Sequence, residues 1–387
     1  MRFPEFSGEW EMASLQDIAA INPKSDQLQN TFIYIDLEAV EKGELRKIQE
    51  IMREEAPSRA QRVINNNDIL FQCVRPYQKN NYIHKILNTS NQQWVASTGY
   101  AQIRTTESPN YIYHLLNTDG FNRKVMVRCT GSSYPAINSE DLATIRFYYT
   151  PDKKEQFKIS RLLDLIDERI ATQNKIIEKL QSLIRGIMVE LQKRGLSNGT
   201  WKKVLLSNVL TERNELNKSL YPVYSVSVIQ GIVNQMEYLG RSFAASDTSK
   251  YHVVHYGDLV YTKSPTGSFP YGIIKQSYNQ NEVAVSPLYG VYEPKTFSTG
   301  VFLHEYFKSE LNTLNYLHPL VQKGAKNTIN IANQRFLESY VAIPSNANEL
   351  LAISKLLCSL NTKLEFLQNI LKQSQGQKQY LLRQMFI

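Results

Sequence analysis

The sequence predicts a protein of the α+β class that is made of two related halves. Each half is expected to supply a globular domain followed by a long helix. The two helices are expected to pair as an antiparallel two-helix coiled coil, which separates two globular domains related by a pseudo-twofold axis. Three observations support this prediction: sequence echoes at about half the chain length, two helical stretches with an apolar stripe, and 387 residues, enough for more than one core.

Stretches of the first half recur in the second half in the same order. Ser160–Ile170 (SRLLDLIDERI) returns as Ser354–Leu364 (SKLLCSLNTKL), 194 positions later (354 minus 160). The further pairs, at offsets of 189 to 193, join Trp10 with Trp201, Leu15 with Leu206, Asp68 with Asp258, Tyr100 with Tyr289, Asn138 with Asn330 and Pro151 with Pro344. An ordered set at a nearly constant offset indicates a duplicated domain.

The globular halves, residues 1–150 and 196–343, are expected to mix short strands and short helices. Between the shared positions the two halves differ strongly in sequence, which is typical of one scaffold carrying two different surfaces. Candidate strands are short, rich in β-branched and aromatic residues, and bounded by turn residues. They are Asp68–Val74, Gly99–Thr105, Asp258–Lys263 and Leu288–Pro294.

The first long helix is predicted over residues 151–195. Pro151 and Asp152 are start signals, Asp152 can cap the first free N–H groups, and Glu155 can reach back to the cap. Gly195 is expected to end the helix. Nine of ten heptad a and d positions are apolar, as in a coiled coil. They are Ile159, Leu163, Ile166, Ile170, Gln173, Ile177, Leu180, Ile184, Ile187 and Leu191.

The second long helix is predicted over residues 344–387, with Asn346 as its cap and Glu349 three residues later. Eight of its ten seam positions are apolar; Ser374 and Lys378 are polar, so we expect a local gap or a bound partner there. The seam is Ile353, Leu357, Leu360, Leu364, Leu367, Leu371, Ser374, Lys378, Leu381 and Met385.

Each helix alone would expose its apolar stripe to water. Pairing the two helices within one chain is favoured because both lie at high effective concentration. A homodimeric coiled coil is the alternative. About 40 residues at 1.5 Å each make a rod of roughly 60 Å.

The composition permits a polyanionic partner without requiring one. The formal net charge is +8 and the isoelectric point is about 9.1. Three scattered cysteines without metal-ligand spacing fit a reducing compartment. No apolar run suits a membrane span, and the N-terminus does not resemble a signal peptide. We therefore expect a cytoplasmic protein with no membrane association.

Motifs for catalysis are missing from the sequence. It contains no phosphate-binding glycine loop, no dinucleotide fingerprint and no Asn-Pro-Pro-aromatic motif of adenine methyltransferases, and Asn22–Ser25 (NPKS) is better explained as a turn. The stretch Pro151–Lys158 lacks nuclease spacing, and the six histidines lack zinc spacing with cysteine. We expect a chain that is not an enzyme and binds no cofactor or metal itself.

Two groups of residues give the pattern a family resemblance. The first is Pro4-Glu5-Phe6, Gly8, Trp10, Leu15 and Ile18; the second is Gly131-Ser132-Ser133, Ile137-Asn138, Leu142, Ile145, Pro151 and Glu155-Gln156. With two variable halves and two long helices, the chain resembles the specificity (S) subunit of type I restriction-modification systems. The second copy departs from the pattern, with Lys323-Gly324-Ala325 and no Glu-Gln after Pro344.

The resemblance implies a DNA-recognition function. Such subunits carry two target-recognition domains that read the two halves of a split target in double-stranded DNA, and their helices fix the spacer. The helices also dock two modification (methyltransferase) subunits, which bind S-adenosylmethionine, and through them the restriction (motor-nuclease) subunits. The sequence leaves three alternatives: a coiled-coil adaptor or scaffold, a nuclease with an unseen site, and a DNA reader without methyltransferase partners.

Side chains for DNA contact are sought in the loops after the two Asp-containing strands and in nearby basic positions, because Arg, Lys, Asn and Gln read base edges while Lys, Arg, Ser, Thr and Tyr bind phosphates. The first-half candidates are Arg75, Tyr77, Lys79, Asn80, Arg104, Arg123, Lys124 and Arg128. The second-half candidates are Lys263, Ser264, Thr266, Lys323, Lys326 and Asn327.

Overall fold

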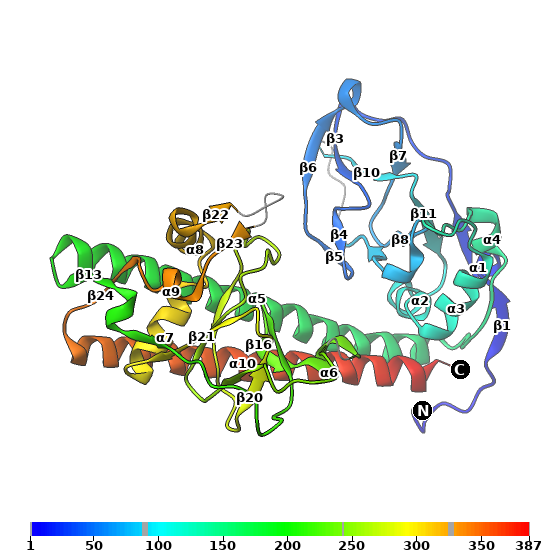
Figure 1. The fold of residues 1–387 in the computed structure, drawn as a ribbon. Coiled ribbons are helices and arrows are strands. Elements are labelled where there is room, and N and C mark those ends of the chain that lie inside the picture. Colours follow the sequence, from blue (N-terminus) through cyan, green and yellow to red (C-terminus); the bar gives the residue numbers. More distant parts are fainter. Residues whose placement is uncertain (1, 87–91, 242–243, 324–328, 387) are drawn as a thin grey trace. The chain divides into compact units, whose positions relative to one another are not determined.

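The computed structural model describes residues 2–86, 92–241, 244–323 and 329–386 (Figure 1). It confirms a mixed α+β fold. The chain divides into two compact units: unit 1 is Met1–Asn174 with Asn369–Ile387, and unit 2 is Lys175–Gln368. In the described ranges, none of the helices has the length and apolar character needed to cross a membrane.

Unit 1 is built on two four-stranded sheets, with strand orders β2-β11-β8-β9 and β6-β3-β10-β7. Its strands are β1 (Glu11–Ser14), β2 (Ala19–Ile21), β3 (Thr31–Ile35), β4 (Val40–Glu41), β5 (Glu44–Leu45), β6 (Gln49–Met52), β7 (Ala60–Val63), β8 (Ile69–Gln72), β9 (Tyr82–Ile83), β10 (Trp94–Ser97), β11 (Tyr100–Thr105) and β12 (Arg146–Tyr149). Its helices are α1 (Leu15–Ile18), α2 (Pro109–Leu116), α3 (Asp119–Arg128), α4 (Ser139–Ala143) and the first part of α5 (Lys153–Ser197).

Unit 2 contains one four-stranded sheet, β14-β21-β18-β19, and several two-stranded ones. Its strands are β13 (Trp201–Leu205), β14 (Leu210–Glu212), β15 (Tyr224–Ser227), β16 (Gly231–Asn234), β17 (His252–Val254), β18 (Leu259–Tyr261), β19 (Ile274–Gln276), β20 (Val283–Val285), β21 (Gly290–Pro294), β22 (Gln322–Lys323), β23 (Ile329–Asn330) and β24 (Tyr340–Pro344). Its helices are α6 (Gln235–Leu239), α7 (Phe297–Tyr306), α8 (Glu310–Leu317), α9 (Asn333–Phe336), the rest of α5 and the first part of α10 (Ala347–Met385).

The two units repeat one sheet topology. The order β2-β11-β8-β9 in unit 1 corresponds strand for strand to β14-β21-β18-β19 in unit 2, and every pairing in both sheets is antiparallel. The pair β1-β12 likewise corresponds to β13-β24. The four predicted strands are confirmed as β8, β11, β18 and β21. The duplication seen as sequence echoes is therefore a duplication of structure.

Beyond this scaffold the two units share part of a second sheet. In unit 1 this sheet is β6-β3-β10-β7, in which β10 pairs with β3 in parallel and with β7 in antiparallel. In unit 2 the antiparallel pair β17-β20 corresponds to β7-β10, and a parallel bridge from Val223 to Ala284 corresponds to the pairing of β3 with β10. The units differ in the connection that follows: β4 and β5 lie between β3 and β6, whereas β15 and β16 form a short hairpin.

In unit 1 the start of α5 packs against the end of α10, and the helices run in opposite directions. Leu163 of α5 shares a buried core with Leu382 and Met385 of α10. Further along α5, the Asp167 carboxylate forms an ion pair of 2.6 Å with Lys378, which precedes those residues in α10. Within unit 1 the apolar stripes of the two helices are therefore buried against each other.

In unit 2 the end of α5 packs against the start of α10. Ile184 and Met188 lie in one core with Ile353 and Leu357. Asn346 caps α10 as predicted, because its side-chain oxygen accepts the N–H groups of Asn348 at 2.8 Å and Glu349 at 3.4 Å. The Asn346 cap satisfies donors that a helix start otherwise leaves open.

The prediction of a gap around Ser374 is wrong. The helix α10 continues through Lys372–Gln379 without interruption. Ser374 is 4% exposed, and Lys378 is held by the Asp167 carboxylate. A small hydroxyl and a paired ammonium therefore fit the seam without breaking it.

Gly195 does not end α5 as predicted, because the helix continues to Ser197. The glycine serves packing. A Cβ atom at residue 195 would lie 2.2 Å from Cδ1 of Trp201, a buried residue whose Nε1 donates to the Glu349 carboxylate at 2.8 Å. Gly199, with φ of +66°, lies just beyond the helix and takes the left-handed conformation instead.

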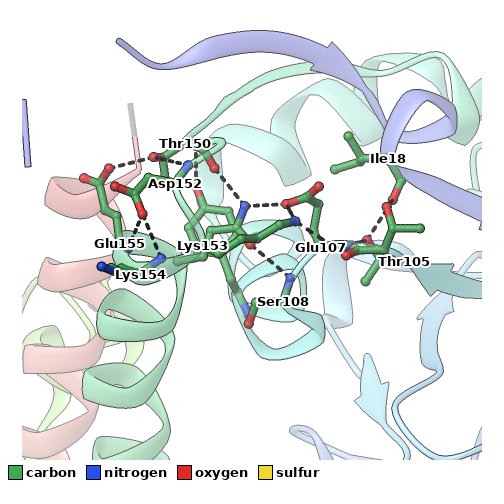
Figure 2. Close-up of polar contacts among 12 residues, drawn as sticks. Ile18, Thr105, Glu107, Ser108, Thr150, Asp152, Lys153, Lys154 and Glu155 are labelled. Atoms are coloured by element: carbon green, nitrogen blue, oxygen red, sulfur yellow. Dashed lines mark hydrogen bonds and ion pairs between the residues drawn. The ribbon is translucent and has the colours of Figure 1, made fainter. Parts of the chain in front are cut away.

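Figure 2 shows how α5 begins. The Asp152 carboxylate accepts the N–H groups of Lys154 at 2.8 Å and Glu155 at 3.3 Å, so the predicted cap is confirmed. The prediction that Glu155 reaches back to the cap is wrong. Its fully buried carboxylate accepts the Thr150 hydroxyl at 2.6 Å and two N–H groups of Arg2 at 2.6 and 2.8 Å. A buried carboxylate needs such donors, which the exposed cap could not supply.

Gln156 joins the start of α5 to the globular part of unit 1. Its side chain accepts the N–H of Ser108, the cap of α2, at 3.0 Å and donates to the Thr150 carbonyl at 2.8 Å. It also donates to the Glu107 carboxylate at 2.5 Å, which forms an ion pair with Lys153. The Glu-Gln pair at the helix start is therefore structural: both side chains tie α5 to the sheet domain.

Candidate DNA-contacting surface

A buried aspartate stands at the start of the corresponding strands β8 and β18. Asp68 accepts the N–H of Asn65 at 2.7 Å, and Asp258 accepts the N–H of His255 at 2.9 Å, so each carboxylate closes the turn that leads into its strand. Both carboxylates are at most 2% exposed. A buried carboxylate must also be paired with a cation, and each of these binds one arginine.

The arginine comes from a different place in each unit. In unit 1, Arg104 on β11 binds Asp68 through Nε and Nη2, both at 2.8 Å. In unit 2, Arg213 follows β14 and binds Asp258 through Nε at 2.8 Å and Nη2 at 3.2 Å. The candidate Arg104 is therefore engaged in holding the sheet together, and its two nitrogens on that edge are already used.

The loop after β8 carries four candidates on a strained backbone. Arg75 and Lys79 both have left-handed conformations, with φ of 55° and 53°, and they flank the 3-10 turn Pro76–Gln78. Such conformations cost energy in a residue other than glycine and cluster at functional sites. Tyr77 lies in the turn with 51% of its surface exposed. The loop thus presents an arginine, a tyrosine and a lysine together.

Two candidates of this loop have partners inside unit 1. The Lys79 ammonium binds the Asp119 carboxylate at 2.7 Å and the Asn117 carbonyl at 3.2 Å. The Asn80 side chain accepts the N–H of Lys42 at 3.0 Å. These contacts fix the loop against α3 and against the β4-β5 hairpin; of the four candidates Tyr77 is exposed, while Arg75 is half-buried.

Arg75 lies against the ring of Tyr134, with its guanidinium carbon 4.3 Å from the ring centroid. Tyr134 is 65% exposed and belongs to the loop that follows Gly131-Ser132-Ser133. Sequence reasoning found the glycine-serine motif and missed the tyrosine, although an aromatic residue in an exposed loop next to a basic loop is the signal that would have found it.

The corresponding loop after β18 holds Lys263, Ser264 and Thr266. Lys263 also has a left-handed conformation, with φ of 58°. Burial lowers the pKa of its ammonium, while Ser264 stays exposed and its carbonyl accepts the Thr266 hydroxyl at 3.0 Å. Both corresponding loops therefore place a basic residue in a strained backbone conformation.

The candidates Arg123, Lys124 and Arg128 lie on α3. The Lys124 ammonium donates to the carbonyl of Arg146 at 2.8 Å, and Arg128 donates to the Asp141 carbonyl at 2.8 Å and the Thr144 hydroxyl at 2.6 Å. The structure brings Lys124 and Arg128 together with Arg146 around a shallow depression, which is also lined by Val127, Thr144 and Ile145. The sequence did not single out Arg146.

The remaining candidates are Lys323, Lys326 and Asn327. Lys323 belongs to β22. Lys326 and Asn327 lie outside the described residues.

Known proteins resemble the chain in part of its sequence and in its fold. Residues 7–182 match the family model described as type I restriction modification DNA specificity domain. No curated protein matches the chain in sequence.

Two solved structures share the fold over nearly the whole chain. One is the S subunit of the type I restriction-modification system from M. genitalium, with a TM-score of 0.60, 13% identity and coverage of 98% of this chain and 96% of that one. The other comes from a structure of complex assembly and conformational transition of the type I R-M system, with a TM-score of 0.51, 16% identity and coverage of 97% and 96%. Residues 7–182 therefore match the type I restriction modification DNA specificity domain in sequence, and the chain as a whole shares the fold of these two solved structures.

Proposed function

We propose that the chain is the DNA sequence-recognition subunit of a type I restriction-modification complex. Each of its two globular domains reads one half-site of a split target in double-stranded DNA. The chain itself carries out no catalysis. Methylation of adenine and binding of S-adenosylmethionine belong to two modification subunits that dock on the helices α5 and α10, and restriction subunits join through them.

One observation carries this proposal: the strand order β2-β11-β8-β9 recurs as β14-β21-β18-β19 in a chain with a type I DNA specificity domain. A repeated scaffold presents its loops in the same way twice. The loops after β8 and β18 each hold a basic residue in a left-handed conformation, Arg75 and Lys263. Because the two globular parts differ strongly in sequence, the two half-sites are expected to differ in sequence.

The helices support the division of labour. In each unit the helix segments bury one apolar stripe against each other, yet further large apolar side chains stay exposed on them. In unit 2 these residues are Ile176, Leu183, Val189, Leu196, Leu351, Leu356 and Phe366. Over the full length of both helices, such side chains have exposed fractions of 42 to 68%. Exposed apolar side chains on a helix pair are suited to binding a partner protein.

The test is to sequence the methylated positions of the host genome with and without this chain. The expected result is one motif in two defined parts separated by unspecified bases, with methylation lost when the chain is deleted. A continuous motif, or methylation that does not depend on the chain, would contradict the proposal. Purification of the tagged chain separates it from an adaptor, because only the proposed subunit should bring down a methyltransferase in a ratio of two to one.

A further inference from the structure

Most basic candidate side chains of unit 1 already have acceptors within the protein. Arg104 binds Asp68 and Lys79 binds Asp119, while Lys124 and Arg128 donate to backbone carbonyls. Within the described ranges, Arg75 and Arg123 form no side-chain hydrogen bond or ion pair. Arg75 differs from Arg123 in having its guanidinium carbon 4.3 Å from the centroid of the Tyr134 ring.

The backbone holds Arg75 and Tyr134 in register with each other. The Arg75 N–H donates to the Pro135 carbonyl at 2.7 Å, and the Ile137 N–H donates to the Cys73 carbonyl at 3.0 Å. The two segments that carry Arg75 and Tyr134 are therefore joined by two backbone hydrogen bonds next to the contact. The backbone hydrogen bonds therefore fix the positions from which the two side chains start.

The loop that carries Tyr134 is itself closed. Thr130 and Ala136 exchange two backbone hydrogen bonds of 2.9 Å. Gly131 takes a φ of +89°, and a Cβ atom there would lie 3.0 Å from the Tyr134 carbonyl oxygen. The glycine of the Gly131-Ser132-Ser133 motif thus allows the tight turn that presents the tyrosine.

The setting restrains the guanidinium of Arg75. The face of the Tyr134 ring covers one side of it, and the left-handed backbone of Arg75 limits the directions that its side chain can take. A flat fork of N–H donors suits two acceptors at once, as in bidentate binding to a phosphate or to the O6 and N7 atoms of guanine in the major groove. The recognised motif separates these two acceptors, because only a guanine contact carries sequence information.

We propose that Arg75 reads a guanine in the half-site bound by unit 1 and that Tyr134 positions the guanidinium for it. This inference rests on the proposed function. Tyr134 is a positioning residue whose exposed ring lies beneath the arginine.

The experiment replaces the chain in its host by Arg75→Lys, Tyr134→Leu and Tyr134→Phe variants and sequences the methylated motif. Arg75→Lys keeps the charge and loses the planar fork. Discrimination at one guanine position of one half-site is expected to fall by roughly 5- to 150-fold, which corresponds to the value of a bidentate base contact. Tyr134→Leu should relax the same position, Tyr134→Phe should preserve it because the ring remains, and the other half-site should stay unchanged.

A glycine variant controls for folding, because glycine tolerates the left-handed conformation better than arginine does. Arg75→Gly relieves the strain and is expected to keep or raise the thermal midpoint of unfolding, while the discrimination for guanine is lost. An unchanged motif in Arg75→Lys, or uniformly weaker methylation with the motif intact as for a phosphate contact, would overturn the inference. Those outcomes leave a split motif in place and so differ from failure of the proposed function, in which the unaltered chain gives no split motif.

Discussion

Gly195 offers a test in which packing and helix propensity predict opposite signs. In the interior of a helix, Gly→Ala is ordinarily stabilising by up to about 1 kcal/mol. At Gly195, however, the new Cβ would lie 2.2 to 2.4 Å from three atoms of the Trp201 indole. Real Cβ atoms do not approach so closely, and the indole belongs to the core of unit 2. Either the helix end or the indole must move.

The magnitude follows from what the movement breaks. Forcing an extra carbon into a packed core costs about 1–3 kcal/mol. Displacing Trp201 also weakens its 2.8 Å hydrogen bond to the Glu349 carboxylate, a type of bond that contributes about 1.5–3 kcal/mol. After subtraction of the propensity gain, Gly195→Ala is expected to destabilise unit 2 by about 2–4 kcal/mol.

Gly186 provides the matched control on the same helix. A Cβ atom at residue 186 would meet nothing within 4 Å, so Gly186→Ala should stabilise unit 2 by up to about 1 kcal/mol. The assay is urea unfolding followed by Trp201 fluorescence, in a chain whose two other tryptophans, Trp10 and Trp94, are replaced by Phe. If both alanine variants shift the midpoint in the same direction, the packing argument is wrong.

Two further predictions concern stability. Burial lowers the pKa of His84, a fully buried residue between the rings of Tyr82 and Trp94, from 6.5 to about 4. Between these pH values the unfolded chain binds a proton at His84 that the folded chain does not bind. The free energy of unfolding is therefore unaffected above about pH 6.5 and falls by about 3 kcal/mol as the pH is lowered toward 4. His84→Phe should make the urea midpoint of unit 1 less dependent on pH over that range, and an unchanged pH dependence would refute the assignment. Asn346→Ala removes the cap of α10 and should lower the free energy of unfolding of unit 2 by about 1 kcal/mol, measured by urea unfolding. A loss below about 0.3 kcal/mol would mean that solvent replaces the cap.

The sequence alone was sufficient for the features that depend on local pattern and on repetition. The apolar stripes of the two helices, the caps Asp152 and Asn346, and the four predicted strands follow from spacing and residue type, and the structure has them. The correspondence between Asp68 and Asp258 in the repeat is also confirmed, because in each unit a buried carboxylate closes the turn into the corresponding strand.

The failures concern contacts between residues that are far apart in the chain. Glu155 looked like half of a capping box, but Arg2 lies 153 positions away and supplies its cation. Gly195 looked like a helix end because glycine commonly follows the last helical residue. Its contact with the Trp201 indole could not be foreseen from local sequence. Arg104 looked like a surface cation, although it neutralises Asp68. Local pattern cannot identify such partners, since each is set by which strands and helices become neighbours.

The echo SRLLDLIDERI and SKLLCSLNTKL is explained by two faces of each helix. Leu163 and Leu357 occupy the same place in the repeat and are both fully buried, which is the requirement of the seam. Ser160 and Ser354 are also buried, although a coiled-coil seam has no need of serine.

Serine is retained because a second face of each helix lies against the globular part of its own unit. In unit 2 the Ser354 hydroxyl meets the Ser298 hydroxyl of α7 at 3.0 Å, and Asn361 donates to the buried Glu305 carboxylate of the same helix at 2.7 Å. In unit 1 the Ser160 hydroxyl donates to the Phe157 carbonyl of its own helix at 3.1 Å, and the polar contact with the globular part is made four residues later, where Asp164 of α5 pairs with His114 of α2 at 2.8 Å.

These contacts hold each long helix in one position against its domain, because polar partners must meet in register whereas apolar surfaces can slide. A reader held in this way keeps its orientation to the helix that carries it. The duplicated polar face therefore serves the proposed function as directly as the apolar seam does: the seam joins the helices, and the polar face fixes what each helix carries.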